Sequence, residues 1–557
     1  MAKRLAVTIA GAVSLGSYEA GVLFEFLDAI RQHNADPAVS PTDRVEIDVL
    51  TGASAGGMTA IILAQKLLFS GDDFEGPYDN PLYNTWVKRI SLEGLQQTSD
   101  DELALHSLFS SNLIEAISEE ALMARYAGPL PPPKRHGAVG NRIRVGVAMT
   151  NLNGIGYGYD LCPSGRFVYL NYGDQRTRLV DAAIPACDTA TFWEPLREAA
   201  VACGAFPIAF RAQDVLRSAK GEPDDYSASN LMPWDQDPAP FTYSDGGVLQ
   251  NQPLGIAKNL VDMIDQHLNQ EERFYLFVSP HAKDPAANDA FHEANADYLR
   301  LIRRLLDVVM GQSGFQDWIT AQGVNKRVAL LDERAEGLKR AIGGGAINVS
   351  ALQTTATSLL GLFFPGGSHI PPGATLPESL DAAKQRIAKQ YVVEMDALGG
   401  GSPEALAFRD AVLAFETAAG LGARDLMTIY GVTATASQLA GAGLQAFLGF
   451  FDQRFRDHDY DVGRSHAREV LANPVLAAPG SIGPIHYVGC DIRPIDTRLD
   501  GLQLNQVPAA DLSMFKAGMK KRLNQMLHEL MGRTAFIADP VADAVLGGVL
   551  DYVIYRS

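Results

Sequence analysis

The alternation of apolar and polar residues near the start of the chain predicts two β-turn-α units. Residues 5–10 and 45–50 are short apolar runs, and each is followed by a turn that contains glycine. Residues 18–31 then place apolar side chains on one face of a helix, and residues 58–69 form a second apolar helix. Strands that feed helices through short turns build a mostly parallel sheet with helices on its faces, whose loops gather at the carboxyl edge.

Later apolar runs extend this sheet. Further strands are expected at residues 142–148, 166–170 and 274–279. Residues 218–240, which are rich in Asp, Ser and Pro, predict an irregular excursion before the stretch TYSDGG from Thr242 to Gly247. The first half of the chain therefore has the pattern of an α/β fold.

The second half is dominated by helical patterns separated by breaks rich in glycine and proline. Its helices are expected at residues 295–340, 376–397, 403–420 and 436–456. We therefore expect an α/β domain over residues 1–285 and a mainly helical region over residues 286–557. That region could serve as a lid, a membrane-docking surface or an oligomer contact, and the oligomeric state stays open.

Composition narrows the class of partner. The 557 residues carry a formal charge of −18, with 47% hydrophobic and 20% charged residues. Nucleic acid is not an expected partner, because phosphate binding needs clustered Lys and Arg. The negative charge also disfavours broad electrostatic adhesion to anionic membranes. A peripheral contact with a membrane would therefore have to be local and apolar. No run reaches the ~18 uninterrupted apolar residues of a spanning helix.

The cysteines and the first residues bear on the compartment. Cys162, Cys187, Cys203 and Cys490 match neither a zinc-site spacing nor a disulfide framework, which predicts reduced thiols. Polar residues soon interrupt the apolar run at residues 5–10, so it resembles a buried strand more than a signal peptide. These features favour a cytoplasmic protein, with a peripheral membrane contact left open.

One serine lies among residues with very small side chains. Thr51 to Gly57 read TGASAGG and follow an apolar run. A serine hydroxyl that attacks an ester has to be exposed on a tight turn between a strand and a helix, and bulky neighbours would bury it. Ser54 is therefore a candidate nucleophile, although small residues at such a turn also permit close packing alone.

Two further stretches contain glycine-rich turns. The first, GAVSLG from Gly11 to Gly16, lies between the first strand and helix, where backbone N–H groups can face an anion. It lacks the glycine spacing of a dinucleotide site and the Lys-Ser/Thr of a phosphate loop. The second is DGGVLQNQP, from Asp245 to Pro253. Alone, either stretch could be an ordinary structural turn.

Taken in this order, the three stretches resemble the patatin-like phospholipases, a family of lipid acyl hydrolases. The family pattern is a glycine-rich oxyanion loop, a Gly-x-Ser-x-Gly motif after the next strand, and a much later Asp-Gly-Gly. Ala205 to Phe210, AFPIAF, is similar to a further block of the family. The resemblance spans residues 5–255 and implies a three-layer α/β/α domain with a mostly parallel central sheet.

The resemblance also implies roles for individual residues. Ser54 would be the nucleophile and Asp245 the base of a Ser-Asp dyad, which needs no metal or other cofactor. Burial should raise the pKa of Asp245 so that it can accept a proton. The remaining residues form two groups. The oxyanion hole would comprise Gly11, Ala12, Val13, Ser14 and Ala55, and the motifs would be supported by Gly16, Gly52, Gly56, Gly246 and Gly247.

The sequence departs from the family pattern in the oxyanion loop. Ala12 and Val13 replace two glycines, and Leu15 occupies a position where arginine is usual. Backbone donors survive these changes, but the geometry of the loop is left open. Residues 450–464 resemble an element of longer bacterial members, with a salt-bridged helix end packed on the core as the alternative interpretation.

Two other functions remain compatible with the sequence. An α/β-hydrolase with a Ser-His-Asp triad also uses Gly-x-Ser-x-Gly, and His458, His466 and His486 all follow Asp245. A non-catalytic lipid-binding or partner-binding module could retain the same fold.

The substrate class is open among phospholipid, glyceride, simple ester and thioester. Met232, Trp234 and residues 363–370 are candidates for an acyl pocket or an interfacial contact, with core packing as the alternative.

Overall fold

The computed structural model describes residues 2–161, 165–219, 226, 231–265, 273–280, 291, 298–370, 377–420, 427–444, 447–478 and 480–531. These residues belong to two compact units. Unit 1 comprises Met1–Ala257, Phe274–Asp317 and Ile429–Ser557, and unit 2 comprises Lys258–Arg273 and Trp318–Thr428. The compact units therefore differ from the expected division at residue 285, which stays a prediction about folding domains.

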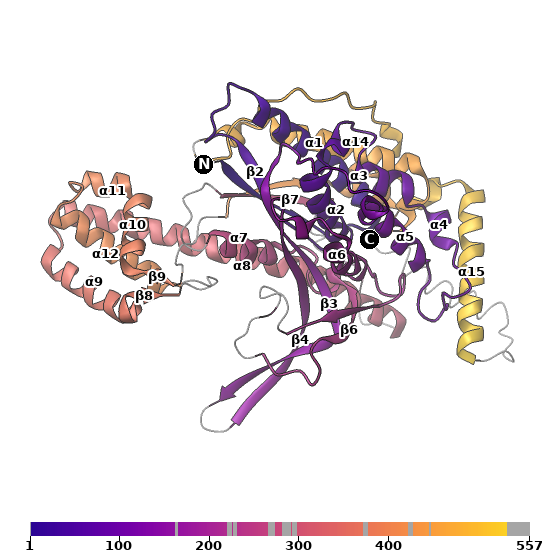
Figure 1. The fold of residues 1–557 in the computed structure, drawn as a ribbon, viewed down its shortest axis with the longest axis horizontal. Helices are drawn as coiled ribbons and strands as arrows, with labels where there is room; N and C mark the ends of the chain where they lie inside the picture. Colours follow the sequence, from indigo (N-terminus) through magenta and orange to yellow (C-terminus); the bar gives the residue numbers. More distant parts are fainter. Residues whose placement is uncertain are drawn as a thin grey trace. The chain divides into compact units, whose positions relative to one another are not determined.

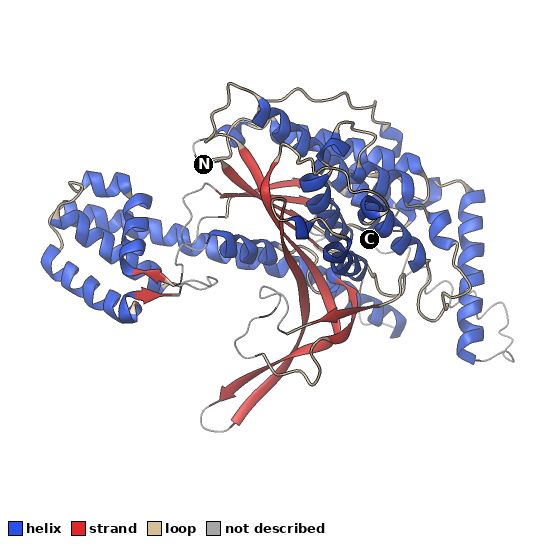
Figure 2. Cartoon of the chain, viewed as in Figure 1, coloured by secondary structure: helices blue, strands red, loops and turns tan. Residues whose placement is uncertain are grey.

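Unit 1 is built on a mixed sheet with helices on its faces (Figure 2). Its strands are β1 Lys3–Ile9, β2 Val45–Gly52, β3 Val139–Leu161, β4 Gly165–Asp181, β5 Gln213–Arg217, β6 Ala239–Asp245, β7 Arg273–Ser279 and β10 Ile429–Thr433. The order is β10-β7-β1-β2-β3-β6-β5, with β4 paired to β3. The pairs β1–β2, β2–β3 and β7–β10 are parallel, whereas β6 pairs antiparallel with β3 and β5. The expected strands and the α/β/α class are confirmed.

The first two expected helices are also confirmed. In unit 1 the helices are α1 Gly16–Ala35, α2 Ala55–Phe69, α3 Pro81–Tyr83, α4 Leu92–Gln96, α5 Ser111–Leu122, α6 Ala190–Cys203, α13 Ala440–Gly443, α14 Gln453–Leu471 and α15 Ala509–Met531. Two helices, α7 Leu254–Asp265 and α8 Tyr298–Gly343, have residues in both units. No helix among the residues that the structure describes has both the length and the apolar composition needed to cross a bilayer.

Helices α1 and α14 lie side by side in unit 1, although they come from opposite ends of the chain (Figure 1). Glycines allow the two backbones to approach. A Cβ at Gly21 of α1 would meet the carbonyl oxygen of Tyr460, and one at Gly463 would meet that of Tyr18. Buried Arg464 donates to Glu25 of α1 at 2.9 Å. The stretch at residues 450–464 therefore packs on the core of unit 1 through a buried ion pair. This agrees with the alternative interpretation of the sequence, a salt-bridged helix end.

Unit 2 has its own apolar core. Its elements are α9 Val349–Phe363, β8 Ser368–His369, β9 Glu378–Ser379, α10 Leu380–Gln390, α11 Val392–Ala397 and α12 Pro403–Ala418. Phe408 and Val412 of α12 are buried with Ile387 of α10. Phe364 is buried in this same core, so part of the stretch at residues 363–370 packs internally.

The helix expected at residues 436–456 is wrong. Residues 440–443 form the single turn α13, Leu448–Phe450 form a 3-10 turn, and α14 begins at Gln453. The carboxylate of Asp459 accepts the backbone N–H groups of Ala440 and Gly441 at 2.7 and 2.9 Å. These bonds hold the segment against α14, and its glycines have a low preference for a continuous helix. Residues 220–225 and 227–230 of the excursion expected at residues 218–240 lie outside the described residues.

Candidate active site

Ser54 lies at the turn between β2 and α2, where it precedes the first residue of the helix. Its backbone has φ 52° and ψ −126°, a region that residues other than glycine rarely adopt. The turn is compact because a Cβ at Gly52 would meet the backbone of Gly56, and one at Gly56 would meet the carbonyl oxygens of Ile9 and Ala10. These glycines are therefore required by the turn that presents Ser54.

Asp245 ends β6 and lies directly beside Ser54. The Ser54 hydroxyl donates a 2.6 Å hydrogen bond to Oδ2 of Asp245, and the backbone N–H of Gly247 donates to Oδ1, also at 2.6 Å. Thr150 of β3 donates to the Asp245 carbonyl oxygen at 2.8 Å. The Asp245 side chain is thus held in one orientation toward the serine.

The environment of the Asp245 carboxyl group alters its protonation. The residue is only 1% exposed, and burial raises its pKa to about 7. The hydrogen bonds from Ser54 and Gly247 act in the opposite direction, because they favour the charged form. Asp245 therefore titrates near neutrality, where a carboxylate can accept a proton from a hydroxyl group.

The glycines after Asp245 allow close contacts on both sides. A Cβ at Gly246 would meet the carbonyl oxygen of Ala148, and one at Gly247 would lie 2.6 Å from Oδ1 of Asn251. The Asn251 carbonyl oxygen accepts the backbone N–H of Gly11 at 3.0 Å. Asn251 thus connects the Asp-Gly-Gly turn with the glycine-rich loop. It lies in the same DGGVLQNQP stretch, but the sequence gave no reason to single it out.

The loop from Gly11 to Gly16 borders the same site. A Cβ at Gly11 would meet the Asn251 side chain and the Ser54 Cβ, so the loop closely approaches the serine. Val13 to Leu15 form a 3-10 turn that leads into α1, and Val13 has a positive φ of 49°. Because the Gly11 N–H is already bonded to Asn251, it is not free to stabilise an oxyanion in this conformation. In this conformation Gly11 allows close packing, and its expected role as a donor stays a prediction.

The other loop residues have identifiable surroundings. A Cβ at Gly16 would meet the Trp86 ring at 2.7 Å, so glycine is needed where α1 begins. Ala12 and Leu15 are buried in the core of unit 1. Leu15 packs beside Gly441, which explains how an apolar side chain replaces the usual arginine here. Ala55, the first residue of α2, follows the serine directly.

The C-terminal part of unit 1 also packs against this loop. Ser14 is buried next to Gly441 and Gly449, and its hydroxyl has no hydrogen-bond partner among the described residues. The nearby Asp459 carboxylate holds the segment containing Gly441 through the two N–H bonds given above. Gly441 and Gly449 thus pack against the loop from outside the first half of the chain, a contact that the sequence did not predict.

The three histidines considered for a triad, His458, His466 and His486, each contact other residues. His458 contacts Asp459 at 3.0 Å and Asp500 at 2.9 Å. His466 Nδ1 lies 3.1 Å from the Tyr18 hydroxyl, and the His486 ring stacks on His33. The hydrogen-bond partner of the Ser54 hydroxyl among the described residues is the Asp245 carboxyl group.

Two candidate apolar residues, Met232 and Trp234, precede β6 and pack beside β3 and β6. Trp234 packs edge-on against Phe241 of β6, and Met232 lies beside Gly156 of β3. Cys203 is a buried free thiol whose Sγ lies 3.7 Å from the Ser54 carbonyl oxygen, and burial raises its pKa. The thiol therefore stays protonated and does not compete with Ser54 as a nucleophile.

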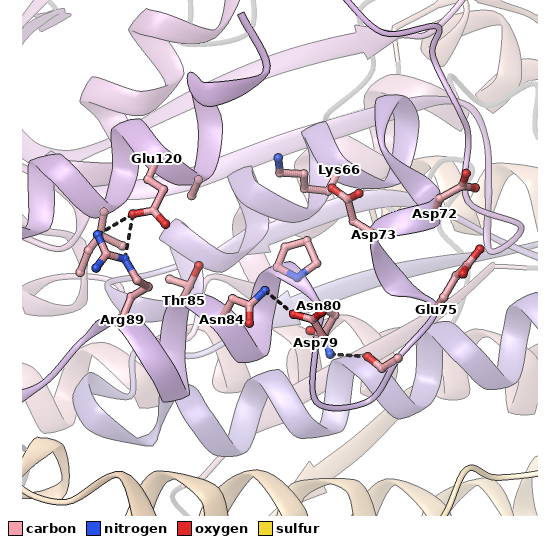
Figure 3. Close-up of a pocket in the computed structure, with 14 residues that line it drawn as sticks. Lys66, Asp72, Asp73, Glu75, Asp79, Asn80, Asn84, Thr85, Arg89 and Glu120 are labelled. Carbon is pink, nitrogen blue, oxygen red and sulfur yellow. Dashed lines mark hydrogen bonds and ion pairs between the residues drawn. The ribbon is translucent and has the colours of Figure 1, made fainter. Parts of the chain in front are cut away.

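A cavity of about 540 Å³ lies elsewhere in unit 1, and it contains neither Ser54 nor Asp245. Figure 3 shows its acidic rim, including Asp72, Asp73 and Glu75, with Lys66 on one wall. Arg89 and Glu120 form an ion pair at another wall. Most of the residues that line this cavity are polar or charged, and neither Ser54 nor Asp245 is among them, so we do not assign it to the Ser54 site.

Comparison with known proteins assigns the domain that contains this site. Residues 7–258 match the family model described as patatin-like phospholipase. The chain is 24% identical over 409 residues to the uncharacterized protein y4iI of Sinorhizobium fredii, covering 59% of this chain and 57% of that protein. It is 27% identical over 268 residues to the uncharacterized membrane protein Rv3479 of Mycobacterium tuberculosis, covering 45% and 22%. The matched parts thus fall short of two thirds of either relative.

Proposed function

Residues 7–258 belong to the patatin-like phospholipase family, and we propose that this chain is a lipid acyl hydrolase with Ser54 as nucleophile and Asp245 as base. The observation that carries the proposal is the 2.6 Å hydrogen bond from the Ser54 hydroxyl to a buried carboxyl group whose pKa is about 7. The family match supports activity on lipid esters. The Ser-Asp dyad is our own assignment for this chain.

In the first half-reaction, Ser54 Oγ attacks the carbonyl carbon of the ester while its proton passes to Asp245 Oδ2. The carbonyl oxygen becomes an oxyanion in the tetrahedral intermediate. When the intermediate collapses, the bond to the leaving alcohol breaks and Asp245 returns the proton to the alcohol oxygen. The product is an acyl-Ser54 ester and a free alcohol.

In the second half-reaction, water attacks the acyl-Ser54 carbonyl and gives its proton to Asp245. Collapse of the second intermediate breaks the bond to Ser54 Oγ, which recovers the proton, and the carboxylic acid leaves. We assign stabilisation of both oxyanions to backbone N–H groups of Ala12, Val13, Ser14 and Ala55. Each such donor is worth ~3–4 kcal/mol in well-studied hydrolases.

The test compares the wild type with Ser54→Ala and Asp245→Asn on p-nitrophenyl esters, labelled phospholipids and glycerides. We expect activity in the wild type and a loss of at least ~10³-fold in either variant. A fluorophosphonate should form an adduct on Ser54 by mass spectrometry. The control is Ser118→Ala, because Ser118 is also a buried serine and bonds to the Glu115 carbonyl oxygen in α5.

Two results would contradict the proposal. A well-folded wild type with neither turnover nor adduct would favour a non-catalytic binding module. Full activity of Asp245→Asn would require another base for Ser54. The substrate panel separates phospholipid, glyceride and simple ester, which the dyad alone does not distinguish.

A further inference from the structure

Strands β3 and β4 continue beyond the sheet of unit 1 as a two-stranded ribbon (Figure 1). We call residues 152–161 and 165–172 the distal ribbon. A register shift separates it from the part of β3 that lies in the sheet. Tyr157 then pairs with Tyr169, and Tyr159 with Phe167. One contact with the rest of unit 1 is the hydrogen bond from the Met232 N–H to the Gly156 carbonyl oxygen at 2.9 Å.

Both faces of the distal ribbon present apolar side chains to solvent. On one face, the Tyr169 ring stacks on those of Tyr157 and Tyr159, and Phe167 beside them is 54% exposed. On the other, Val168 and Leu170 are 46% and 48% exposed. An antiparallel ribbon in water normally has one polar face. Contiguous apolar surface of this kind marks an interaction site.

The charge and composition of the ribbon indicate its occupant. Residues 152–172 contain one acidic residue, Asp160, and one basic residue, Arg166, in a chain with a net charge of −18. The ribbon is therefore a neutral patch on an acidic protein. Tyrosine and phenylalanine are favoured at the boundary between lipid and water. This combination matches a zwitterionic lipid surface, which requires no basic residues.

The same strand connects the ribbon to the active site. Met149 of β3 pairs with Asp245, and Thr150 donates to the Asp245 carbonyl oxygen. At ~3.3 Å per residue, Tyr159 lies at most about 33 Å along the strand from Met149. The ribbon thus belongs to the same strand as residues that contact Asp245.

We propose that the distal ribbon docks the protein on the surface of zwitterionic lipid, with its aromatic and aliphatic side chains entering the interface. The inference rests on the proposed function in one respect, because that function makes lipid the substrate. Docking through the ribbon would raise the local concentration of lipid at the domain without involving the chemistry of Ser54.

The experiment measures flotation of the full chain with phosphatidylcholine vesicles, in the Ser54→Ala background so that no lipid is consumed. We expect vesicle binding that a further Phe167→Ser and Tyr169→Ser change lowers at least about tenfold. Binding should change little with salt, because the ribbon carries no net charge. The matched control is Val488→Ser, an apolar residue of unit 1 that is 81% exposed outside the ribbon.

The melting temperature of each variant shows whether it is folded, and replacing exposed side chains should leave that temperature unchanged. Equal vesicle binding by the ribbon variant and its parent would overturn the proposal, as would absence of binding by the parent. Light scattering provides a further test. Self-association that Phe167→Ser and Tyr169→Ser abolishes would make a second copy the occupant instead of lipid. Adduct formation on Ser54 tests the dyad independently of all these outcomes.

Discussion

Ser14 of the loop from Gly11 to Gly16 packs directly against Gly449, so the loop is supported by a segment from the second half of the chain. A Cβ at position 449 would lie 2.9 Å from the Ser14 Cβ and even closer to its hydroxyl. The loop is thus confined between this segment and the Asp-Gly-Gly turn, where Gly11 bonds to Asn251. The replacement of loop glycines by Ala12 and Val13 is accommodated within these supports.

We expect Gly449→Ala to reduce kcat on a soluble ester by about tenfold or more, because the new methyl group displaces Ser14 and the adjacent donors. Gly431→Ala is the control, since a Cβ there meets no atom within 4 Å. Ser14→Gly should partly restore kcat in the double variant by making room. Wild-type kcat in Gly449→Ala would show that the support has no influence on catalysis.

The pH dependence of activity should follow Asp245. Because only the ionised carboxylate can accept the Ser54 proton, kcat/KM should rise with pH and level off above a pKa of about 7. The measurement is a pH profile with a soluble ester whose own ionisation lies outside the range. A rise in kcat/KM centred near pH 4 would mean that burial does not perturb the pKa of this carboxyl group in solution.

The contribution of Asp245 to the free energy of unfolding should depend on pH in the opposite direction, falling as pH rises. The folded pKa of Asp245 is raised to about 7, above the ~3.9 of an unfolded aspartate, so the folded state binds more protons between these values. The contribution of this group is fully present below pH ~4 and is lost as pH rises through 7. It amounts to at most ~4 kcal/mol.

Asp245→Asn removes this titration. Denaturant unfolding at pH 5 and pH 8 should show the variant gaining stability relative to the wild type at the higher pH. A difference between the two proteins that is constant across this range would contradict the raised pKa.

The backbone at Ser54 predicts a difference between two inactive variants. Its φ of 52° with ψ −126° suits glycine and strains residues that carry a Cβ. The free energy of unfolding should therefore be ~1 kcal/mol higher for Ser54→Gly than for Ser54→Ala. Equal stabilities in denaturant titrations would indicate that the turn relaxes when the hydroxyl group is removed.

The contact between α1 and α14 makes a prediction about folding alone. Gly21→Ala should lower the free energy of unfolding by ~1–3 kcal/mol, because its Cβ would meet the Tyr460 carbonyl oxygen. In contrast, Gly337→Ala in α8 meets no atom within 4 Å and should be neutral or stabilising, since alanine is the better helix former. A neutral Gly21→Ala would show that the two helices can separate without cost.

The sequence by itself determined the first two β-turn-α units, the α/β class and the candidate pair Ser54 and Asp245. These features depend on local pattern, because the turn from Gly52 to Gly56 and the Asp-Gly-Gly stretch at Asp245 each consist of adjacent residues. Asn251 lay within a motif that had been recognised, but its contact with Gly11 has no local signal.

Only the tertiary structure decided what surrounds the dyad. It showed that the Gly11 N–H is occupied, that Gly441 and Gly449 pack against the loop from Gly11 to Gly16, and that the helix expected at residues 436–456 is interrupted. It also showed that β3 and β4 extend beyond the sheet with both faces apolar. The physical reason is that hydrogen-bond occupancy, burial and close packing depend on residues far apart in the chain, whereas periodicity reports only which face of an element is apolar.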